Sequence, residues 1–207
     1  RYRALRRASG VATDPAGHRQ WRCLPETVSR KPRYRSDPAV WVSPGRYRIE
    51  DKVTYPQDVY LHPEKRIVVI SGPNAGGKSI TLKTVGLLQL MLQSGMLIPV
   101  RESSKACLFE QILTDIGDNQ SIENHLSTYS YRLKNMKYFL RKCNANTLFL
   151  IDEFGTGSDP ELGGALAEVI LEDFYGREAF GIITTHYSNL KALANELPFM
   201  VNANLQF

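Results

Sequence analysis

The sequence predicts an α/β domain with a mostly parallel sheet flanked by helices, preceded by a basic, poorly structured segment. From about residue 50, apolar strand-like runs alternate with helix-like patterns, as they do in parallel sheets covered by helices. One such run, RIVVI at 66–70, leads through a glycine-rich loop into a helical pattern. We therefore expect residues 49–207 to form the folded domain and residues 1–48 to be a linker or an arm.

The expected elements follow in chain order. The apolar runs that predict strands are DVYL (58–61), RIVVIS (66–71), CLFEQI (107–112), TLFLI (147–151) and FGIITT (180–185). Helices are predicted at 78–93, 127–142 and 160–176. Apolar stripes at helical spacing support the first two helices, namely Leu82, Val85, Leu88 and Leu92, and then Tyr129, Leu133, Met136 and Leu140. Favoured stop residues follow the first helix (Gly95) and end the third (Gly176), which begins at Pro160, a favoured first residue.

Positive charge is concentrated at the beginning of the chain. Residues 1–48 contain 12 lysines and arginines against three acidic residues, a net charge of +9 within a chain total of +5. The segment also has five prolines and shows no sustained helical or strand period. We interpret it as a solvated tail, a linker to another domain or sequence foreign to the fold. The alternative is an arm that neutralises nucleic-acid phosphates, with Arg and Tyr interleaved in KPRYR at 31–35.

Composition argues against several classes of protein. No apolar run approaches the roughly 20 residues of a membrane span, so no membrane partner is expected and the protein is predicted to be cytoplasmic. The three cysteines, Cys23, Cys107 and Cys143, are widely spaced and indicate neither a disulfide framework nor a zinc site. The first methionine is Met91 and the chain ends in the strand-like PFMVNANLQF, so we expect a piece of a longer protein.

The loop after RIVVIS has the composition of a phosphate-binding loop. Gly72, Gly77, Lys78 and Ser79 fit the Walker A pattern G-x-x-x-x-G-K-[ST] between a strand and a helix. The glycines let backbone amides face an anion, and Lys78 reaches the β and γ oxygens of ATP while Ser79 ligates Mg²⁺. The predicted nucleotide-binding residues are Gly72, Pro73, Asn74, Ala75, Gly76, Gly77, Lys78, Ser79 and Ile80. A glycine turn with a purely structural role is the alternative.

Two acidic residues end the run LFLIDE at 148–153. Asp152 is predicted to hold Mg²⁺ as a Walker B carboxylate, and Glu153 to orient and deprotonate the attacking water. A solvated strand end would also place acids here, but the pairing with the glycine-rich loop favours a site. Only Arg101, Arg132 and Arg141 lie between the two motifs, few for the arginine-rich lid of a small-molecule kinase, so hydrolysis is favoured over transfer.

Two further positions are candidates. His186 ends FGIITTH and is predicted to sense the γ-phosphate, because its strand would end at the same sheet edge; a structural histidine is the alternative. Ser127 and Thr128 begin the second amphipathic helix, where their ordinary role is an N-cap. The predicted catalytic residues are therefore Lys78, Glu153 and His186.

These motifs resemble the ATPase domain of the MutS family of DNA mismatch-repair proteins, a branch of the ABC-type ATPases with a P-loop NTPase fold. The resemblance covers about residues 53–207 and rests on GPNAGGKS, the STY at 127–129, LIDEFGTGSDP and TTH, in the family's order. GDNQSIENHLSTYS and DEFGTGSDP are similar to the MutS-two branch, whose full-length members add a C-terminal Smr nuclease domain. No Smr, lever or clamp sequence is present in this chain, so nuclease activity is not assigned to it.

The resemblance implies roles that spacing alone does not. Asn74 would contact the γ-phosphate, and Ser127 would reach the nucleotide of the opposite subunit. Gly155 to Asp159 would form a loop crossing the dimer interface. Tyr55, in TYPQDV, falls where the family packs a side chain against adenine, although Thr54 departs from the family's pattern there.

The function that the resemblance implies is the binding and hydrolysis of ATP, with Mg²⁺, in a homodimer with composite ATP sites. In a bacterial cytoplasm, the dimer would drive a clamp on mismatched or branched DNA through domains absent from this chain. The alternatives are a ribosome-associated quality-control ATPase of the same branch that binds the ribosome or rRNA, another ABC-type ATPase, and a module that binds nucleotide without hydrolysis. LSTYS lacks the glycines of an LSGGQ-like signature, which disfavours another ABC-type ATPase, and Glu153 disfavours the last alternative.

Overall fold

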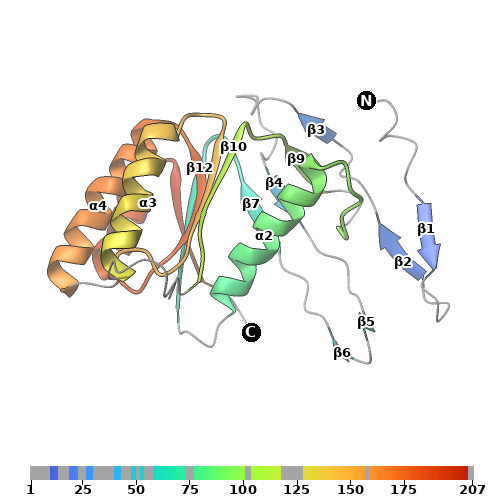
Figure 1. Cartoon of the computed structure of the whole chain (residues 1–207), viewed down its shortest axis with the longest axis horizontal. Coiled ribbons are helices and arrows are strands. Elements are labelled where there is room, and N and C mark those ends of the chain that lie inside the picture. The colour runs from blue at the N-terminus through green and yellow to red at the C-terminus, as the bar shows by residue number, and fades with distance from the viewer. Residues whose placement is uncertain are drawn as a thin grey trace. The chain divides into compact units, whose positions relative to one another are not determined.

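A computed structural model of the chain divides into two compact units (Figure 1). The first unit comprises residues 1–63 and 84–108, and the second comprises residues 64–83 and 109–207. The described residues are 58–72, 77–100, 104–117, 128–156 and 159–204, with short strands at 10–13, 19–22, 27–29, 40–42, 48–49 and 52–53. The predicted domain boundary after residue 48 stays a prediction.

The second unit contains a five-stranded sheet in which every pairing is parallel. Across the sheet the order is β10, β11, β12, β8, β13. The strands are β8 (Ile67–Ser71), β10 (Gln111–Asp115), β11 (Thr147–Ile151), β12 (Phe180–Thr184) and β13 (Met200–Asn204). Every residue of β8, β11 and β12 is buried, as expected of central strands covered on both faces. The predicted α/β architecture with a parallel sheet is confirmed.

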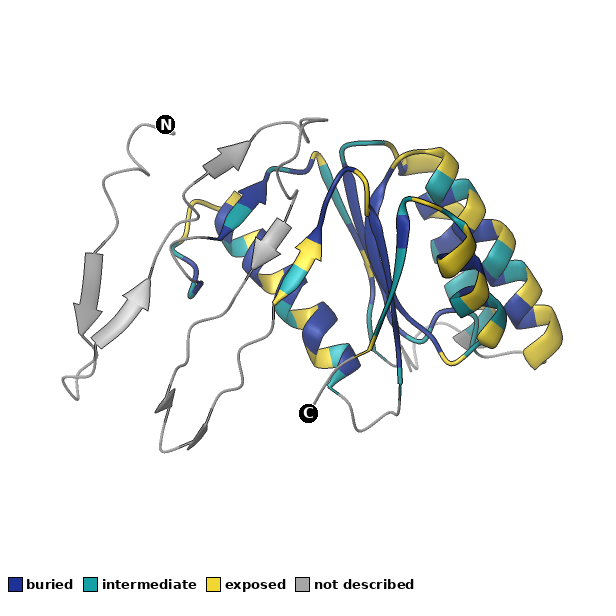
Figure 2. Cartoon of the chain, turned by 180° about the vertical axis from the view of Figure 1, so that it is seen from behind, coloured by how far each residue is buried: buried dark blue, intermediate teal, exposed yellow. Residues whose placement is uncertain are grey.

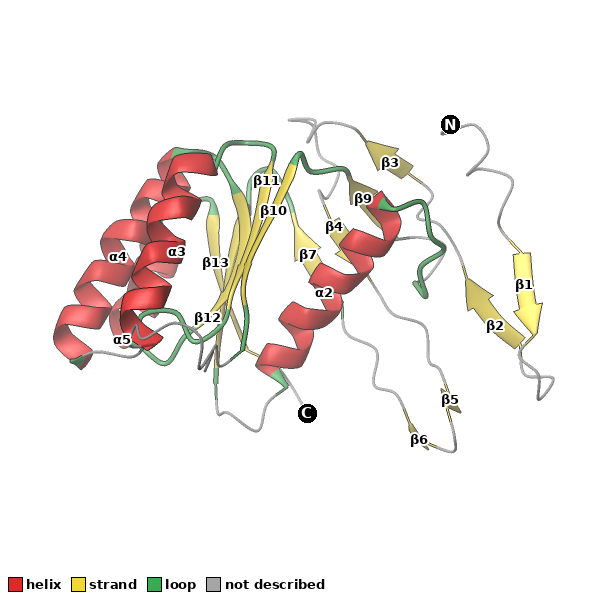
Figure 3. Ribbon diagram, in the orientation of Figure 1, coloured by secondary structure: helices red, strands yellow, loops and turns green. Residues whose placement is uncertain are grey.

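Three helices pack on one face of this sheet (Figures 2 and 3). They are α3 (Thr128–Lys142), α4 (Pro160–Gly176) and α5 (Ser188–Glu196). The side chain of Asp159 accepts hydrogen bonds from the first free amides of α4, and Pro160 is its first residue, so the predicted start is confirmed. In the core beneath the helices, Phe149 of β11 stacks on Phe174 of α4 with ring centroids 4.5 Å apart.

The first predicted helix is α2 (Lys78–Gln93), which begins in the second unit and continues into the first. Its predicted apolar stripe is buried throughout, and Gly95 follows it with a φ of 78°. In α3 the predicted stripe is less complete. Met136 is buried, Tyr129, Leu133 and Leu140 are half-buried, and the buried Phe139 lies outside the predicted stripe.

The first unit contains a four-stranded mixed sheet in the order β3, β9, β4, β7. Its strands are β3 (Thr27–Ser29), β4 (Val40–Val42), β7 (Val59–Leu61) and β9 (Lys105–Cys107). Two of them lie within residues 1–48, and this segment also holds the hairpin of β1 (Gly10–Thr13) and β2 (Arg19–Arg22). The expectation of a poorly structured segment is therefore wrong for these strands. Strands of three residues are too short to show a period of two, and β3 pairs with the distant β9, so no local pattern reveals them.

Two other elements differ from prediction. The sequence predicts one strand at 107–112, but β9 ends at Cys107 and β10 begins at Gln111, in different sheets. The run between them remains apolar at Leu108 and Phe109 and has no glycine or proline, so the pattern hides the point where one unit ends and the other begins. The nine-residue helix α5 is not predicted at all. Across the described ranges, no helix is both long and apolar enough to cross a membrane.

Candidate functional site

The candidate residues follow three strands whose carboxyl ends share one edge of the parallel sheet. Gly72 comes directly after β8, Asp152 comes directly after β11, and His186 comes two residues after β12. A fourth polar residue, Asp115, ends β10 at the same edge. Ligands of open α/β sheets bind outside this edge, so the arrangement has the geometry of a binding site.

The loop after β8 presents backbone and one cation. Gly72 and Gly77 have φ angles of 130° and 70°, which side-chain-bearing residues rarely adopt. Lys78 is 4% exposed, and its Nζ donates to the carbonyl oxygen of Gly72 over 2.5 Å. Ser79 is half-buried and Ile80 is exposed. Since α2 starts at Lys78, its free amides and positive end lie at this loop. The loop residues outside the described range are Pro73, Asn74, Ala75 and Gly76.

A buried hydroxyl joins the two predicted acidic residues. Thr184, the last residue of β12, is fully buried and donates its Oγ1 hydrogen to Oδ1 of Asp152 over 2.5 Å. Oγ1 of Thr184 also accepts a hydrogen bond from the backbone amide of Glu153 over 2.7 Å. Asp152 is 5% exposed, whereas Glu153 is half-buried. Thr184 therefore aligns a buried carboxylate and a more accessible one at the end of β11.

The turn after β11 has an unusual backbone. Glu153 has a φ of 49°, in the left-handed region that few residues other than glycine occupy. Gly155 follows with a φ of 91°, and a Cβ there would lie 2.8 Å from the ring of Tyr187. The hydroxyl of Tyr187 donates to the carbonyl oxygen of Gly155 over 3.2 Å. Tyr187, in the segment after β12, therefore packs against this turn and hydrogen-bonds to it.

Asp115 is a second buried carboxyl group at the edge, and it is 3% exposed. Burial is the main influence and raises its pKa above the ordinary 3.8; the nearby charge of Asp152 acts in the same direction. A hydrogen bond from Nδ2 of Asn135, 3.2 Å long, and the charge of Arg132 oppose that rise. Asp115 is consequently a harder group to ionise than an exposed aspartate.

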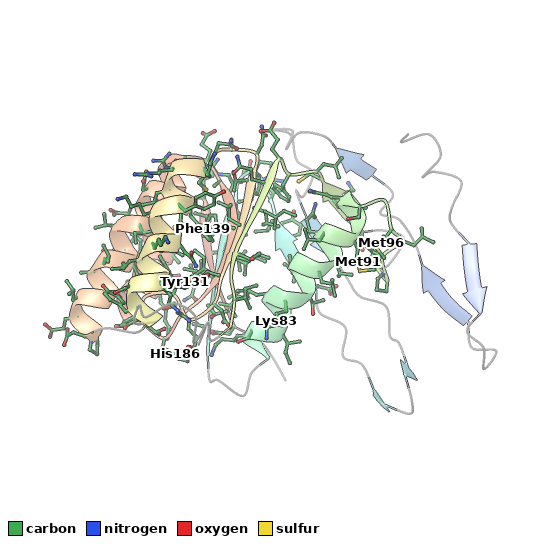
Figure 4. All side chains as sticks on the ribbon, in the orientation of Figure 1. Lys83, Met91, Met96, Tyr131, Phe139 and His186 are labelled. Atoms are coloured by element: carbon green, nitrogen blue, oxygen red, sulfur yellow. The ribbon has the colours of Figure 1, made fainter. Side chains whose placement is uncertain are left out.

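The remaining predicted residues are placed less fully. His186 is exposed, and Figure 4 labels it beyond the strands of the sheet. α3 begins at Thr128, immediately after Ser127 in the sequence. Ser127 and Tyr55 lie outside the described residues, so their roles stay predictions.

Sequence reasoning missed three residues that the structure brings into the site. Thr184 lies within the TTH motif, which was the only signal for it. Asp115 is the last residue of β10, but the predicted strand stops at residue 112, so the sequence does not place Asp115 at a strand end. Arg132 enters the sequence argument merely as one of few arginines, and nothing local indicates that it contacts the turn after β11.

Cysteines add nothing to this site. Cys107 and Cys143 are buried free thiols. Burial raises the pKa of Cys107 to about 12 and that of Cys143 to about 11, so both stay protonated at neutral pH. Cys23 lies outside the described residues.

Comparison with known proteins identifies the family. The family model of MutS domain V matches residues 68–207. A protein named endonuclease MutS2 from Shouchella clausii is 48% identical over 157 residues, which are 76% of this chain and 20% of that protein. Its namesake from Clostridium beijerinckii is 46% identical over 178 residues, which are 86% of this chain and 23% of that protein. The chain thus spans about a fifth of the length of these relatives. It belongs to the MutS family, through domain V, and is similar to the MutS2 proteins.

Proposed function

We propose that this domain binds ATP with Mg²⁺ and hydrolyses it, in a P-loop NTPase fold of the ABC type. One observation carries the proposal: a buried cation at the start of α2 and a buried and a half-buried carboxyl group after β11 follow strands of one parallel sheet. Catalysis of phosphoryl transfer to water depends on such positioning and charge stabilisation rather than on covalent chemistry. The Walker A and Walker B patterns of the sequence fall on these same residues.

The residues fit a magnesium nucleotide. The backbone of Gly72 and Gly77 adopts positive φ angles, as a loop curled around an anion requires, and the Lys78 ammonium is buried beside it. Ser79 and Asp152 supply the hydroxyl and carboxylate oxygens that Mg²⁺ prefers. When bound, the ion would neutralise charge on the β and γ oxygens.

The chain's own groups then have distinct tasks. Lys78 binds the β and γ oxygens, and His186 senses the γ-phosphate from its exposed position after β12. Glu153 orients a water and takes its proton while the water oxygen bonds to the γ-phosphorus. The bond from that phosphorus to the bridging oxygen breaks, which releases ADP and phosphate. Asn74 and Tyr55 complete the proposed contacts with the γ-phosphate and adenine.

Substitution of Lys78 tests nucleotide binding, with Lys83 as a matched control. Lys83 is an exposed lysine of the same helix, labelled in Figure 4. Lys78→Ala removes a charge-assisted contact and should weaken ATP binding about 10- to 100-fold. Lys83→Ala should bind as the unaltered protein does. Equal affinities for the two variants in calorimetric titration would show that the loop does not hold the phosphates.

Substitution of Glu153 separates hydrolysis from binding. Glu153→Gln keeps the size of the side chain but cannot accept the proton, so ATP affinity should persist while phosphate release falls at least about 100-fold. The variant should accumulate in the ATP-bound form. Unchanged phosphate release would remove Glu153 from the mechanism and favour a different base.

A dimer with composite sites is the second part of the proposal. Ser127 precedes α3, whose positive end could serve its own helix or a partner's γ-phosphate. Lys78→Ala and Ser127→Ala should each be nearly inactive in the full-length protein. After subunit exchange, half the dimers are mixed and each has one intact site, so about a quarter of the activity should return. A mixture as inactive as its components, with exchange verified, would place Ser127 in its own subunit's site.

The relatives named endonuclease MutS2 and the MutS domain V match support a role in DNA repair or recombination control. We infer that nucleotide-driven closure of the full-length dimer acts on mismatched or branched DNA. Capture of the full-length protein on branched DNA or on ribosomes, at physiological salt, tests the target. If the protein is captured on ribosomes and not on branched DNA, the ribosome replaces DNA as the proposed partner.

A further inference from the structure

One side chain ties helix α3 to the turn that carries Glu153. Nη1 of Arg132, in the second turn of α3, donates to the carbonyl oxygens of Asp152 (3.2 Å) and Glu153 (2.9 Å). It also donates to Oγ1 of Thr156 over 3.0 Å. Three acceptors share the two hydrogens of one nitrogen, so part of the contact is bifurcated. Arg132 therefore fixes the main chain of the turn by hydrogen bonds to two of its carbonyl oxygens.

Thr156 adds further hydrogen bonds to Arg132 and to the carbonyl group of Glu153. Its hydroxyl accepts from Arg132 and donates to the carbonyl oxygen of Glu153 over 2.8 Å, and its backbone amide donates to the same oxygen over 3.2 Å. The carbonyl group of Glu153 thus accepts from three donors. The backbone amide of Glu153, in turn, donates to Oγ1 of Thr184.

This fixation matters because the backbone of Glu153 is strained. A non-glycine residue with a φ of 49° persists where its surroundings hold it in place. The direction of the carboxylate depends on that backbone, since a return to an ordinary φ would swing the side chain away. Thr184 alone fixes only the amide, and Arg132 and Thr156 fix the carbonyl.

Arg132 also lies near the end of the neighbouring strand β10. Its guanidinium lies close enough to the buried carboxyl group of Asp115 for its charge to act against the effect of burial on that group. Asp115 ends the neighbouring strand β10, and its backbone carbonyl accepts the amide of Asp152 over 2.9 Å. The guanidinium therefore lies near the ends of both β10 and β11.

We propose that Arg132 is a positioning residue for ATP hydrolysis, which holds the main chain of Glu153 so that its carboxylate faces the attacking water. The inference rests on the proposed function. In this proposal Arg132 acts through the main chain of Glu153, to which it donates. Because α3 begins just after Ser127, the same side chain also joins the proposed partner-facing end of α3 to the base.

The first test replaces Arg132 by Gln in the full-length protein and measures ATP affinity and turnover separately. Displacement of the base should lower kcat about 10- to 100-fold, while the Kd for ATP changes less than about twofold. Arg132→Lys restores the charge without the planar fork and should recover only part of the turnover. Arg141→Gln is the control, since Arg141 is an exposed arginine of the same helix.

A double substitution separates positioning from general support of the fold. If Arg132 acts only through Glu153, Arg132→Gln should not lower the residual turnover of Glu153→Gln any further. An additive fall, or an Arg132→Gln protein with unaltered kcat, would overturn the inference and leave the proposed function intact. Absence of ATP hydrolysis by the unaltered protein would overturn both.

Thr156 keeps the inference testable if Arg132→Gln fails to fold. Thr156→Val removes the hydroxyl at nearly constant volume and should lower kcat with ATP affinity retained. Thr156→Ser keeps the hydroxyl and should restore turnover. Equal kcat values for the Val and Ser variants would also overturn the inference, because the hydrogen bonds to the main chain of Glu153 would then have no effect on the base.

Discussion

Asp115 and Asp152 stand at the ends of neighbouring parallel strands, and both are almost fully buried, yet their surroundings differ. Asp152 receives the hydroxyl of Thr184 from β12, which places it on the side of the sheet nearer β8 and its glycine-rich loop. Asp115 ends the edge strand β10 and receives the amide of Asn135 from α3.

The comparison shows that a buried carboxylate at a sheet edge is not by itself a site. Asp152 is joined through one hydroxyl to Glu153, the more accessible acid, and its strand β11 lies next to β12, the strand that leads to His186. Asp115 faces a helix, from which Asn135 donates to its carboxyl group and the charge of Arg132 partly opposes the rise of its pKa on burial. The proposed chemistry therefore lies at the end of β11, and the end of β10 is expected to support it.

The largest expected difference is in turnover. Asp152→Asn removes the carboxylate proposed to hold Mg²⁺ and should lower phosphate release about 100-fold or more. Asp115→Asn should cost less than about tenfold, because an asparagine oxygen can still accept from Asn135. Steady-state phosphate release at saturating ATP and Mg²⁺ measures both. Similar losses for the two variants would abolish the distinction between the strand ends.

Packing beneath the end of β11 gives the next largest effect. A Cβ at Gly181 would overlap the ring of Phe149, the residue opposite it in β11, so Gly181→Ala should destabilise the domain by about 3 kcal/mol. Gly176→Ala is the control, because a Cβ at the end of α4 meets nothing within 4 Å. Urea unfolding measures both free energies. A Gly181→Ala protein as stable as the control would mean that the ring of Phe149 can move aside at little cost.

The hydroxyl that joins Asp152 to Glu153 should contribute less. Thr184→Val leaves the amide of the half-buried Glu153 without this acceptor, beside a fully buried side chain, which we expect to cost about 2 kcal/mol of stability. Turnover should also fall about tenfold, because the two acids lose their common partner. Thr184→Ser retains the hydroxyl and should resemble the unaltered protein more closely. If Val and Ser behave alike, the bridge has no energetic role.

The smallest effect concerns the pH dependence of stability at Asp115. Because burial raises its pKa in the folded state, stability attributable to this group is greatest when it is protonated and falls as pH rises above its ordinary pKa of 3.8. Asp115→Asn removes that loss, so the variant's Tm should exceed the parent's by a few degrees near neutral pH. The difference should shrink toward pH 4. A difference independent of pH, or a lower Tm near neutral pH, would contradict the raised pKa.

Local patterns determined much of the fold. The strand at 147–151 and the helices at 78–93 and 160–176 have their predicted bounds, because β-branched runs, capping residues and glycines act within a few residues of where they stand. The glycine-rich loop and the acidic pair were likewise visible, since each motif is contiguous. Parallel pairing then follows from the alternation of strands and helices.

Tertiary structure alone decided the rest. The three-residue strands β3 and β4 exist because of partners far along the chain, and the break between β9 and β10 lies inside an apolar run. Thr184 meets Glu153 across 31 residues, and Arg132 meets it across 21. The left-handed backbone of Glu153 is imposed by those contacts rather than by its own residue type, since glutamate by itself disfavours a positive φ. Sequence spacing therefore located the acids, and only the folding of β12 and α3 around them determined how they are held.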